Sequence, residues 1–294
     1  MEQGLMTCKD SSFISKLTST NMTNKVFKNQ KVLFSWLAAT VLFFFNSLAH
    51  ANDFAVIATP PRFEITGKPN TVNRQVIEIT NASTTPGKYS IKTADWTLDE
   101  NGGTQFTEAL SPESCRPWVA LERLQISVPS GAKYRYRFEV KPPANTPAQE
   151  CRFAIMISGD EQTAKTADGL SFPFAGRLGI IVYVAVGDVK PNLEVVASEV
   201  KTIENVSKPV ISIRNTGNAH GRLAGFLSGT DAKGQKLEFS PSSLPILVGE
   251  TRKISLDIQQ AEDKPLPTIH YPITIRGNLE WDGKSTPFEQ QFTQ

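Results

Sequence analysis

Hydrophobic and polar residues follow a two-residue period over much of the chain after residue 51. Short runs rich in Val, Ile, Phe, Tyr and Thr recur between clusters of Gly, Pro, Asn and Ser, and no run sustains a helical period. In the segment 133–140, for example, Tyr134, Tyr136 and Phe138 alternate with charged residues. Such alternation is typical of a strand with one face in the core and the other in solvent. The pattern predicts an all-β protein.

The runs predict fourteen strands in two series. The first series is 54–59, 72–80, 88–96, 118–122, 132–140, 152–158 and 178–186. The second series is 193–198, 210–215, 222–228, 237–239, 252–258, 271–279 and 288–292. Seven strands at this spacing are typical of one immunoglobulin-like β-sandwich. Because a turn-rich stretch, 187–191, separates the series, we expect two tandem domains, 52–187 and 188–294.

The N-terminal region has the features of a secretory signal peptide. Residues 32–51 are nearly all apolar, follow three lysines and end in Ala-His-Ala. The alternative is a retained membrane anchor, because about 20 apolar residues could span a bilayer, but the segment turns polar and small from Asn46. We therefore expect residues 1–51 to be a leader that is cleaved after Ala51. We expect the protein to contact the membrane only through this leader, before cleavage. The long polar stretch ahead of the lysines favours a functional start at Met22.

Removal of this leader changes the net charge and the number of cysteines. It removes five lysines and two acidic residues from totals of 31 basic and 29 acidic, so the mature chain is close to neutral. A neutral chain lacks the electrostatic footprint of a nucleic-acid-binding protein. Cys115 and Cys151 are the only cysteines after the leader. We expect them to form a disulfide in an oxidising compartment, and the alternative is two separate buried thiols.

No recognisable catalytic motif is present. The mature chain holds only His220 and His270, in no spacing that would build a metal site or a nucleophile relay. We interpret both as surface or structural residues. Phosphate loops, nucleophile elbows and paired-carboxylate signatures are also missing from the sequence. We therefore expect no enzyme activity, no metal and no cofactor.

A series of short motifs runs through the first domain. They are Pro61–Ile65, Val76–Ser83, Tyr89–Trp96, Arg116–Val119, Leu124–Ile126, Val128–Gly131, Phe138–Val140, Pro142–Pro143 and Cys151–Ile157. In order and spacing they resemble the N-terminal domain of the periplasmic pilus-assembly chaperones of the usher pathway, over about residues 54–187. The resemblance implies a periplasmic location, secreted fimbrial-type subunits as partners, and an outer-membrane usher as a further candidate partner.

In that family the last strand of the first domain is lent to a subunit whose own sandwich lacks a strand, which is β-augmentation. A donor segment needs large apolar side chains two residues apart. The expected donor residues are Leu170, Phe172, Phe174, Leu178 and Ile180. Pro173 interrupts this segment and removes one backbone donor. The alternative is a mobile loop with buried aromatic residues.

The resemblance also implies a basic anchor for the terminal carboxylate of the subunit. Arg62 occupies the arginine position of the match, and a guanidinium can grip a carboxylate through two parallel hydrogen bonds. The alternative is a solvated strand arginine. The family's lysine is missing, because its position falls at Gly179 or Ile180, and Arg177 is the nearest basic residue. The chain also lacks the family's aromatic-basic-proline run at the end of this strand, so it resembles a divergent member.

Two functions follow from this reading of the sequence. The first is a periplasmic molecular chaperone that binds fimbrial or other surface-fibre subunits non-covalently, by strand donation, during export and assembly. The second is an exported structural or adhesive protein of tandem immunoglobulin-like domains without chaperone activity.

Overall fold

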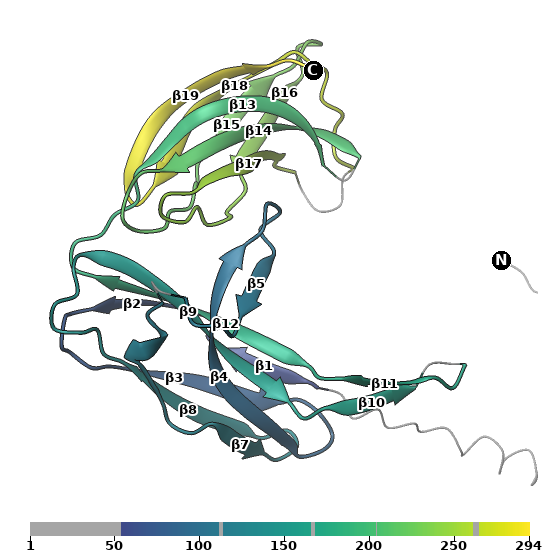
Figure 1. Ribbon diagram of the computed structural model, residues 1–294. Coiled ribbons are helices and arrows are strands. Elements are labelled where there is room, and N and C mark those ends of the chain that lie inside the picture. The colour runs from purple at the N-terminus through teal and green to yellow at the C-terminus, as the bar shows by residue number, and fades with distance from the viewer. Residues whose placement is uncertain (1–53, 112–113, 166–167, 204, 261–264) are drawn as a thin grey trace, which may run out of the picture. The chain divides into compact units, whose positions relative to one another are not determined.

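The computed structural model describes residues 54–111, 114–165, 168–203, 205–260 and 265–294, which form nineteen strands and one 3-10 turn (Figure 1). Within this part of the chain, no helix has the length and apolar character needed to cross a membrane. The predicted leader, residues 1–51, lies outside the described residues.

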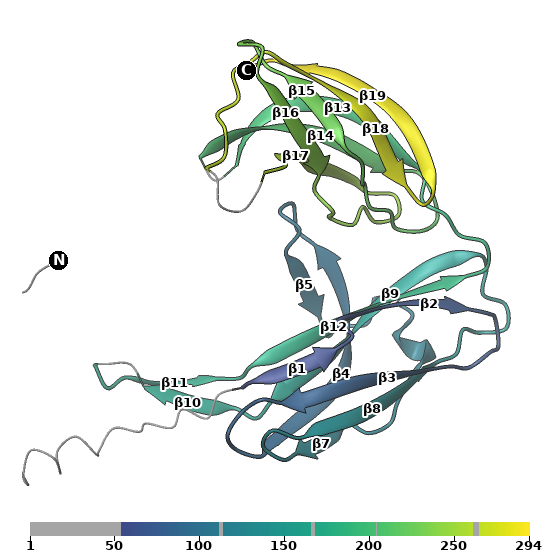
Figure 2. The same ribbon diagram turned by 180° about the vertical axis from the view of Figure 1, so that it is seen from behind.

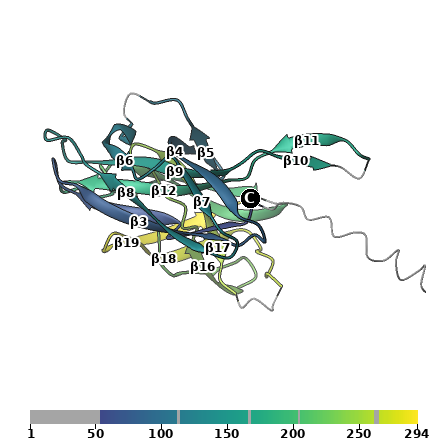
Figure 3. The same cartoon turned by 90° about the horizontal axis from the view of Figure 1, so that it is seen from below.

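The first strand series builds two sheets. Its strands are β1 (Val56–Thr59), β2 (Arg62–Gly67), β3 (Asn73–Asn81), β4 (Gly87–Leu98), β5 (Thr104–Thr107), β6 (Val119–Leu121), β7 (Gln125–Val128), β8 (Lys133–Val140), β9 (Gln149–Gly159), β10 (Gln162–Lys165), β11 (Ser171–Phe174) and β12 (Arg177–Val186), and the 3-10 turn η1 (Arg116–Trp118) precedes β6. One sheet has the order β1-β3-β8-β6, and the other has the order β2-β12-β9-β4-β5 with β7 beside β4. Strands β10 and β11 form a separate hairpin that extends away from these sheets (Figures 2 and 3).

All seven strands predicted for this series are present, as β1, β3, β4, β6, β8, β9 and β12. The prediction missed β2, β5, β7, β10 and β11. Strands β5, β7, β10 and β11 have four residues each, too few for a periodic pattern to stand out. Strand β2 follows β1 after two prolines, Pro60 and Pro61, where the chain leaves the sheet of β3 and joins the sheet of β12.

The inner faces of the two sheets form the first core. The predicted alternation in β8 is confirmed, because Tyr136, Phe138 and Val140 are fully buried. The Phe138 ring packs edge-on against Phe63 and Phe153 from the facing sheet, with centroid distances of 5.2 and 6.5 Å. Such aromatic pairs add to the stabilisation that burial alone provides.

The second series forms one continuous set of seven paired strands. They are β13 (Leu193–Ile203), β14 (Val206–Asn215), β15 (Leu227–Thr230), β16 (Lys236–Pro241), β17 (Thr251–Ile258), β18 (Ile273–Trp281) and β19 (Lys284–Phe292), in the order β13-β14-β17-β16-β15-β18-β19. Strand β17 pairs with β14 through its first residues and with β16 through its last, and so passes between the two layers of a sandwich. Six of the seven predicted strands of this series are present, and the seventh, 222–228, overlaps β15 only at its last two residues. The prediction of an all-β chain with two β-sandwiches is confirmed.

Each sandwich contains a buried asparagine at the end of a strand. The Asn81 side chain at the end of β3 donates hydrogen bonds to the carbonyl oxygens of Thr85 and Val128, at 2.8 and 3.0 Å. Asn215 at the end of β14 bonds the carbonyl of Ile246 in the same way, at 3.0 Å. Both asparagines are fully buried. Each amide thus adds a hydrogen bond to a carbonyl oxygen of a neighbouring segment, and the added bonds fix the following turn against the sandwich.

The expected disulfide joins Cys115 to Cys151, whose Cα atoms lie 5.9 Å apart. Cys151 lies on β9, and Cys115 immediately precedes η1. Both residues are buried. The bond therefore ties the segment before β6 to the centre of the second sheet.

We predict that replacing Cys115 and Cys151 together by alanine will lower the free energy of unfolding by roughly 3 to 4 kcal/mol, because the bond closes a long loop in the unfolded chain. The sequence separation is 36 residues. Urea unfolding followed by circular dichroism measures the loss. Unmodified protein in excess reductant serves as the control and should lose the same amount. Unchanged midpoints in both samples would contradict a stabilising bond.

Candidate functional site

The backbone of β12 is only partly paired. Along one edge it pairs with β9 over its whole length, from Arg177 opposite Ser158 to Val186 opposite Gln149. Along the other edge it pairs with β2 only from Ile181 onward. Residues Arg177–Ile180 therefore have a backbone edge with which no described strand pairs, and we call it the free edge of β12. An unpaired strand edge can accept an extended segment of another chain.

The hairpin before β12 carries exposed apolar side chains. Leu170, Phe172 and Phe174 are 69%, 44% and 38% exposed, and we call these three residues the apolar stripe. Phe172 and Phe174 lie on β11 with ring centroids 6.5 Å apart. The structure thus differs from the alternative of a loop with buried aromatic residues, because β10 and β11 pair as a hairpin and leave both rings at the surface.

The other two expected donor residues lie differently. Leu178 packs partly buried against the first core, and Ile180 is inside that core. Their side chains alternate with Arg177 and Gly179 along β12. At these two positions only the backbone edge is available for pairing, because the side chains pack in or against the first core.

The two candidate anchor residues are both exposed, and the structure does not bring them together. The Arg62 Nε lies 3.0 Å from Glu64 Oε1, and the Arg177 Nη1 lies 3.7 Å from Glu108 Oε1. Arg62 is opposite Ile181, four residues along β12 from Arg177, which corresponds to roughly 13 Å. Exposed ion pairs contribute little free energy. Either guanidinium is therefore able to exchange its present partner for another carboxylate.

The outer face of β12 is covered by a second apolar cluster. Its buried members are Ala94, Trp96, Ala154, Met156, Tyr183 and Leu247. The Tyr183 ring meets Trp96 edge-on at 5.5 Å and stacks on His220 at 3.8 Å, and burial raises the pKa of Tyr183 to about 12. Both faces of β12 are therefore covered. This explains the continuous apolar run in its sequence, which is typical of a strand that is buried on both sides.

His220 and His270 each contact a carboxylate. His220 Nδ1 lies 2.7 Å from Glu150 Oε2, and His270 Nδ1 lies 3.1 Å from Asp231 Oδ2. The His220 side chain is largely buried against Tyr183, so it is structural and not a surface residue. Among the described residues, no three His, Cys, Asp or Glu side chains gather in a way that could hold a metal ion.

One basic residue that the sequence pattern does not single out is Arg222. It lines a cavity of about 350 Å³ together with Glu64, Tyr183 and His220. Its Nη1 donates a hydrogen bond to the carbonyl oxygen of Ser243 at 2.6 Å, and burial lowers its pKa. Within the described part of the chain, Arg222 forms no ion pair. Only the fold brings this arginine near β2, so a search by sequence spacing does not find it.

Comparison with known proteins gives matches in structure only. No family model matches the sequence, and no curated protein matches it closely enough to count as a relative. The chain is similar to a structure of the Salmonella enterica SafA pilin in complex with the SafB chaperone, with 13% identity, 82% of this chain and 98% of that chain covered, and a TM-score of 0.45.

It is also similar to the CsuC–CsuE chaperone and tip-subunit complex of Acinetobacter baumannii Csu pili, with 14% identity, coverage of 81% and 98%, and a TM-score of 0.41. A PapD-like domain of human CEP192 matches 49% of this chain and 98% of its own, with 12% identity and a TM-score of 0.28. Pilus chaperones, the family that the sequence motifs resemble, are thus among the solved structures of similar fold.

We predict that the apolar stripe contributes little to folding. Replacing Phe172 and Phe174 together by serine should change the free energy of unfolding by less than about 1 kcal/mol, because both rings are at the surface. Ile180→Ala should cost about 2 to 5 kcal/mol, since it leaves a cavity in the core. Urea denaturation of the three proteins makes the comparison. A loss in the double variant as large as that of Ile180→Ala would show that the rings pack against the sandwich.

Proposed function

We propose that the protein is an exported, periplasmic chaperone of fimbrial-type subunits and that it holds them non-covalently by lending the free edge of β12. The observation that carries this proposal is the combination of that unpaired edge with the exposed apolar stripe immediately before it. The resemblance of the first domain to usher-pathway chaperones supports the same assignment.

The free edge supplies the backbone half of the interaction. A subunit that lacks one strand exposes unpaired N–H and C=O groups together with an apolar groove, and both are costly in water and prone to aggregation. Residues Arg177–Ile180 can pair with those backbone groups without disturbing β12, because its ladder with β9 lies on the opposite edge.

The apolar stripe supplies the side chains. Three large apolar groups at alternate positions are a costly surface for a soluble protein to keep, and such patches mark interaction sites. Leu170, Phe172 and Phe174 have the two-residue spacing that a groove lined by one face of a sandwich requires. We assign these three residues as the groups that enter the groove of the subunit, and Leu178 and Ile180 as contributors through their backbone.

Arg62 is the proposed anchor for the carboxylate of the subunit. It begins β2 beside the point where the free edge ends, and its present partner, Glu64, is equally exposed. A bidentate contact with an arriving carboxylate is stronger than this single surface contact. Arg177 is the second candidate from the sequence, and Arg222 is the candidate that the cavity beside Glu64 adds.

Co-purification tests this function. The exported protein is purified with each secreted product encoded beside its own gene, as wild type and as the Arg62→Ala and Phe172→Asp variants. We expect wild type to retain a small β-rich subunit and both variants to lose most of it. The first change removes the anchor, and the second places a charge in the apolar contact.

Two matched variants control for general effects. Arg74→Ala removes an exposed, ion-paired arginine from β3, and Phe226→Asp changes a phenylalanine that is 87% exposed in the second sandwich. Both should retain the subunit. If no secreted product is retained by wild type, the alternative of an exported structural or adhesive protein is favoured. If the control variants lose the subunit to the same extent, the assignment of Arg62 and Phe172 to the binding site is wrong.

A further inference from the structure

The two end strands of the second sandwich, β13 and β19, enclose a cleft. They occupy opposite ends of the seven-strand order, and no ladder joins them in the described part of the chain. The cleft between them has a volume of about 660 Å³. Its apolar lining includes the core residues Leu193, Ile213, Leu223, Leu279 and Phe288.

Residues that face the core are exposed at both edges of this cleft. Val195 on β13 lies directly opposite Ile213, so the two side chains share a face of the sheet. Ile213 is fully buried, whereas Val195 is 45% exposed. On the other side, Thr286 lies opposite the buried Leu279 and is exposed. The core-facing sides of β13 and β19 are therefore uncovered at the two edges of the cleft, whereas the core residues at its base are buried.

Two polar groups on the core side of the cleft are hydrogen-bond donors. Trp281 is only 8% exposed, and its indole Nε1–H is buried without a hydrogen-bond partner among the described residues. Lys284 is paired with Trp281 across the two-residue turn Asp282–Gly283, in which both residues have positive φ, as a type I′ hairpin requires. The ammonium and the indole N–H have no acceptor capacity, so both favour a ligand with acceptor atoms.

The acidic residues at the mouth of the cleft do not neutralise this pair. Glu194 lies opposite Arg214 and Glu289 lies opposite Arg276, so both carboxylates belong to the outer faces of their sheets. Lys284 forms no ion pair within the described residues. A ligand that is complementary to the core side of the cleft therefore carries a negative charge.

We infer that this cleft binds an amphipathic carboxylate, a ligand whose carboxylate accepts the Trp281 N–H and pairs with Lys284 while its apolar body lies among the core side chains. The volume is within the range of small-molecule sites, which are mostly apolar with a few convergent polar groups. The ligand is a free acid with an apolar chain or the carboxyl terminus of an apolar peptide, since both present this chemistry. The inference does not depend on strand donation by β12.

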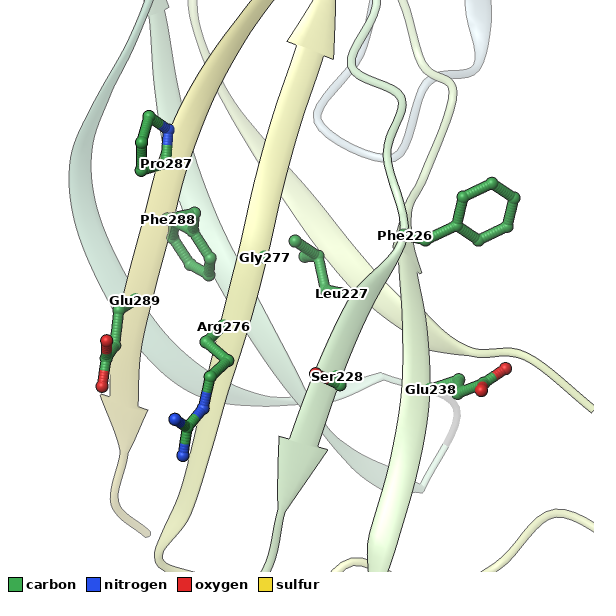
Figure 4. A pocket seen from close by; sticks show the side chains of 9 residues that line it. All are labelled: Phe226, Leu227, Ser228, Glu238, Arg276, Gly277, Pro287, Phe288 and Glu289. Carbon is green, nitrogen blue, oxygen red and sulfur yellow. The ribbon is translucent and has the colours of Figure 1, made fainter.

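A second hollow on the same sandwich provides the control. It lies on the outer surface of β15, β18 and β19, where Figure 4 shows Arg276 beside Glu289 and the Phe226 ring directed away from Gly277. Arg276 is exposed and has Glu289 directly opposite it. Arg276 lies on β18 and does not line the cleft, so Arg276→Gln removes a nearby cation and leaves the residues of the cleft unchanged.

Titration with decanoate tests the inference. The exported protein is labelled with ¹⁵N at the tryptophan indoles, and the Trp281 signal is assigned by its disappearance in Trp281→Phe. We expect decanoate to shift the Trp281 indole signal saturably. The Trp96 signal should stay in place, because that indole already donates to the carbonyl oxygen of Phe153 at 3.1 Å. Lys284→Gln should weaken binding about tenfold, the size of a lost charge-assisted hydrogen bond, and Arg276→Gln should not.

Two further probes separate the sources of the carboxylate. N-acetyl-Ala-Leu-Leu-Leu with a free carboxyl terminus is compared with its amide, and decanoate is compared with decanol. Tighter binding of the peptide acid than of decanoate assigns the cleft to a chain terminus, and the reverse assigns it to a free acid. The inference is overturned if neither carboxylate shifts the Trp281 signal, if decanol or the amide binds equally well, or if Lys284→Gln binds as wild type does.

Discussion

Strand β12 is the element on which the rest of the first sandwich depends. Its inner face contributes Ile180, Val182 and Val184 to the first core, and Tyr183 on its outer face anchors a second apolar cluster. A strand covered on both faces must pair its backbone along its edges, because buried N–H and C=O groups are costly without partners. Strand β9 pairs with one edge completely, whereas β2 pairs with only the last six of the ten residues along the other edge. The four unpaired residues are thus a consequence of where β2 begins, at Arg62.

Both sandwiches have strand edges with unpaired backbone groups, and the residues at these edges differ between the two sandwiches. In the first, the unpaired edge continues into a hairpin with three exposed apolar side chains, a combination suited to an extended partner. In the second, edge strands β13 and β19 carry features that discourage strand addition, a bulge between Val195 and Ala197 and a lysine on the core side at position 284. The gap between those edges is therefore better suited to a small ligand than to a strand.

Buried side-chain hydrogen bonds and the disulfide fix the positions of turns and strand ends in the two sandwiches. Asn81 and Asn215 satisfy backbone carbonyls at equivalent strand ends, and the Cys115–Cys151 bond holds the segment before β6. His220 is the most informative of these groups, because its ring stacks on Tyr183 while Nδ1 bonds Glu150. The Tyr183–His220–Glu150 contacts hold the outer face of β12 in place, which suits the proposed donor edge, since ordering a flexible segment on binding would cost affinity.

The sequence by itself determined the all-β class, thirteen of the fourteen predicted strands and the cysteine pair, because alternation with a two-residue period and turn residues are local signals. It also singled out Leu170, Phe172 and Phe174 by their spacing and Arg62 by resemblance. Only the tertiary structure decided that Ile180 lies in the core, that Arg177 pairs with Glu108 away from Arg62, and that Arg222 lines a cavity beside Glu64. It also placed Lys284 and Trp281 at the cleft between β13 and β19. These outcomes depend on which strands become neighbours and where their pairing stops, and that is set by packing between residues distant in the chain.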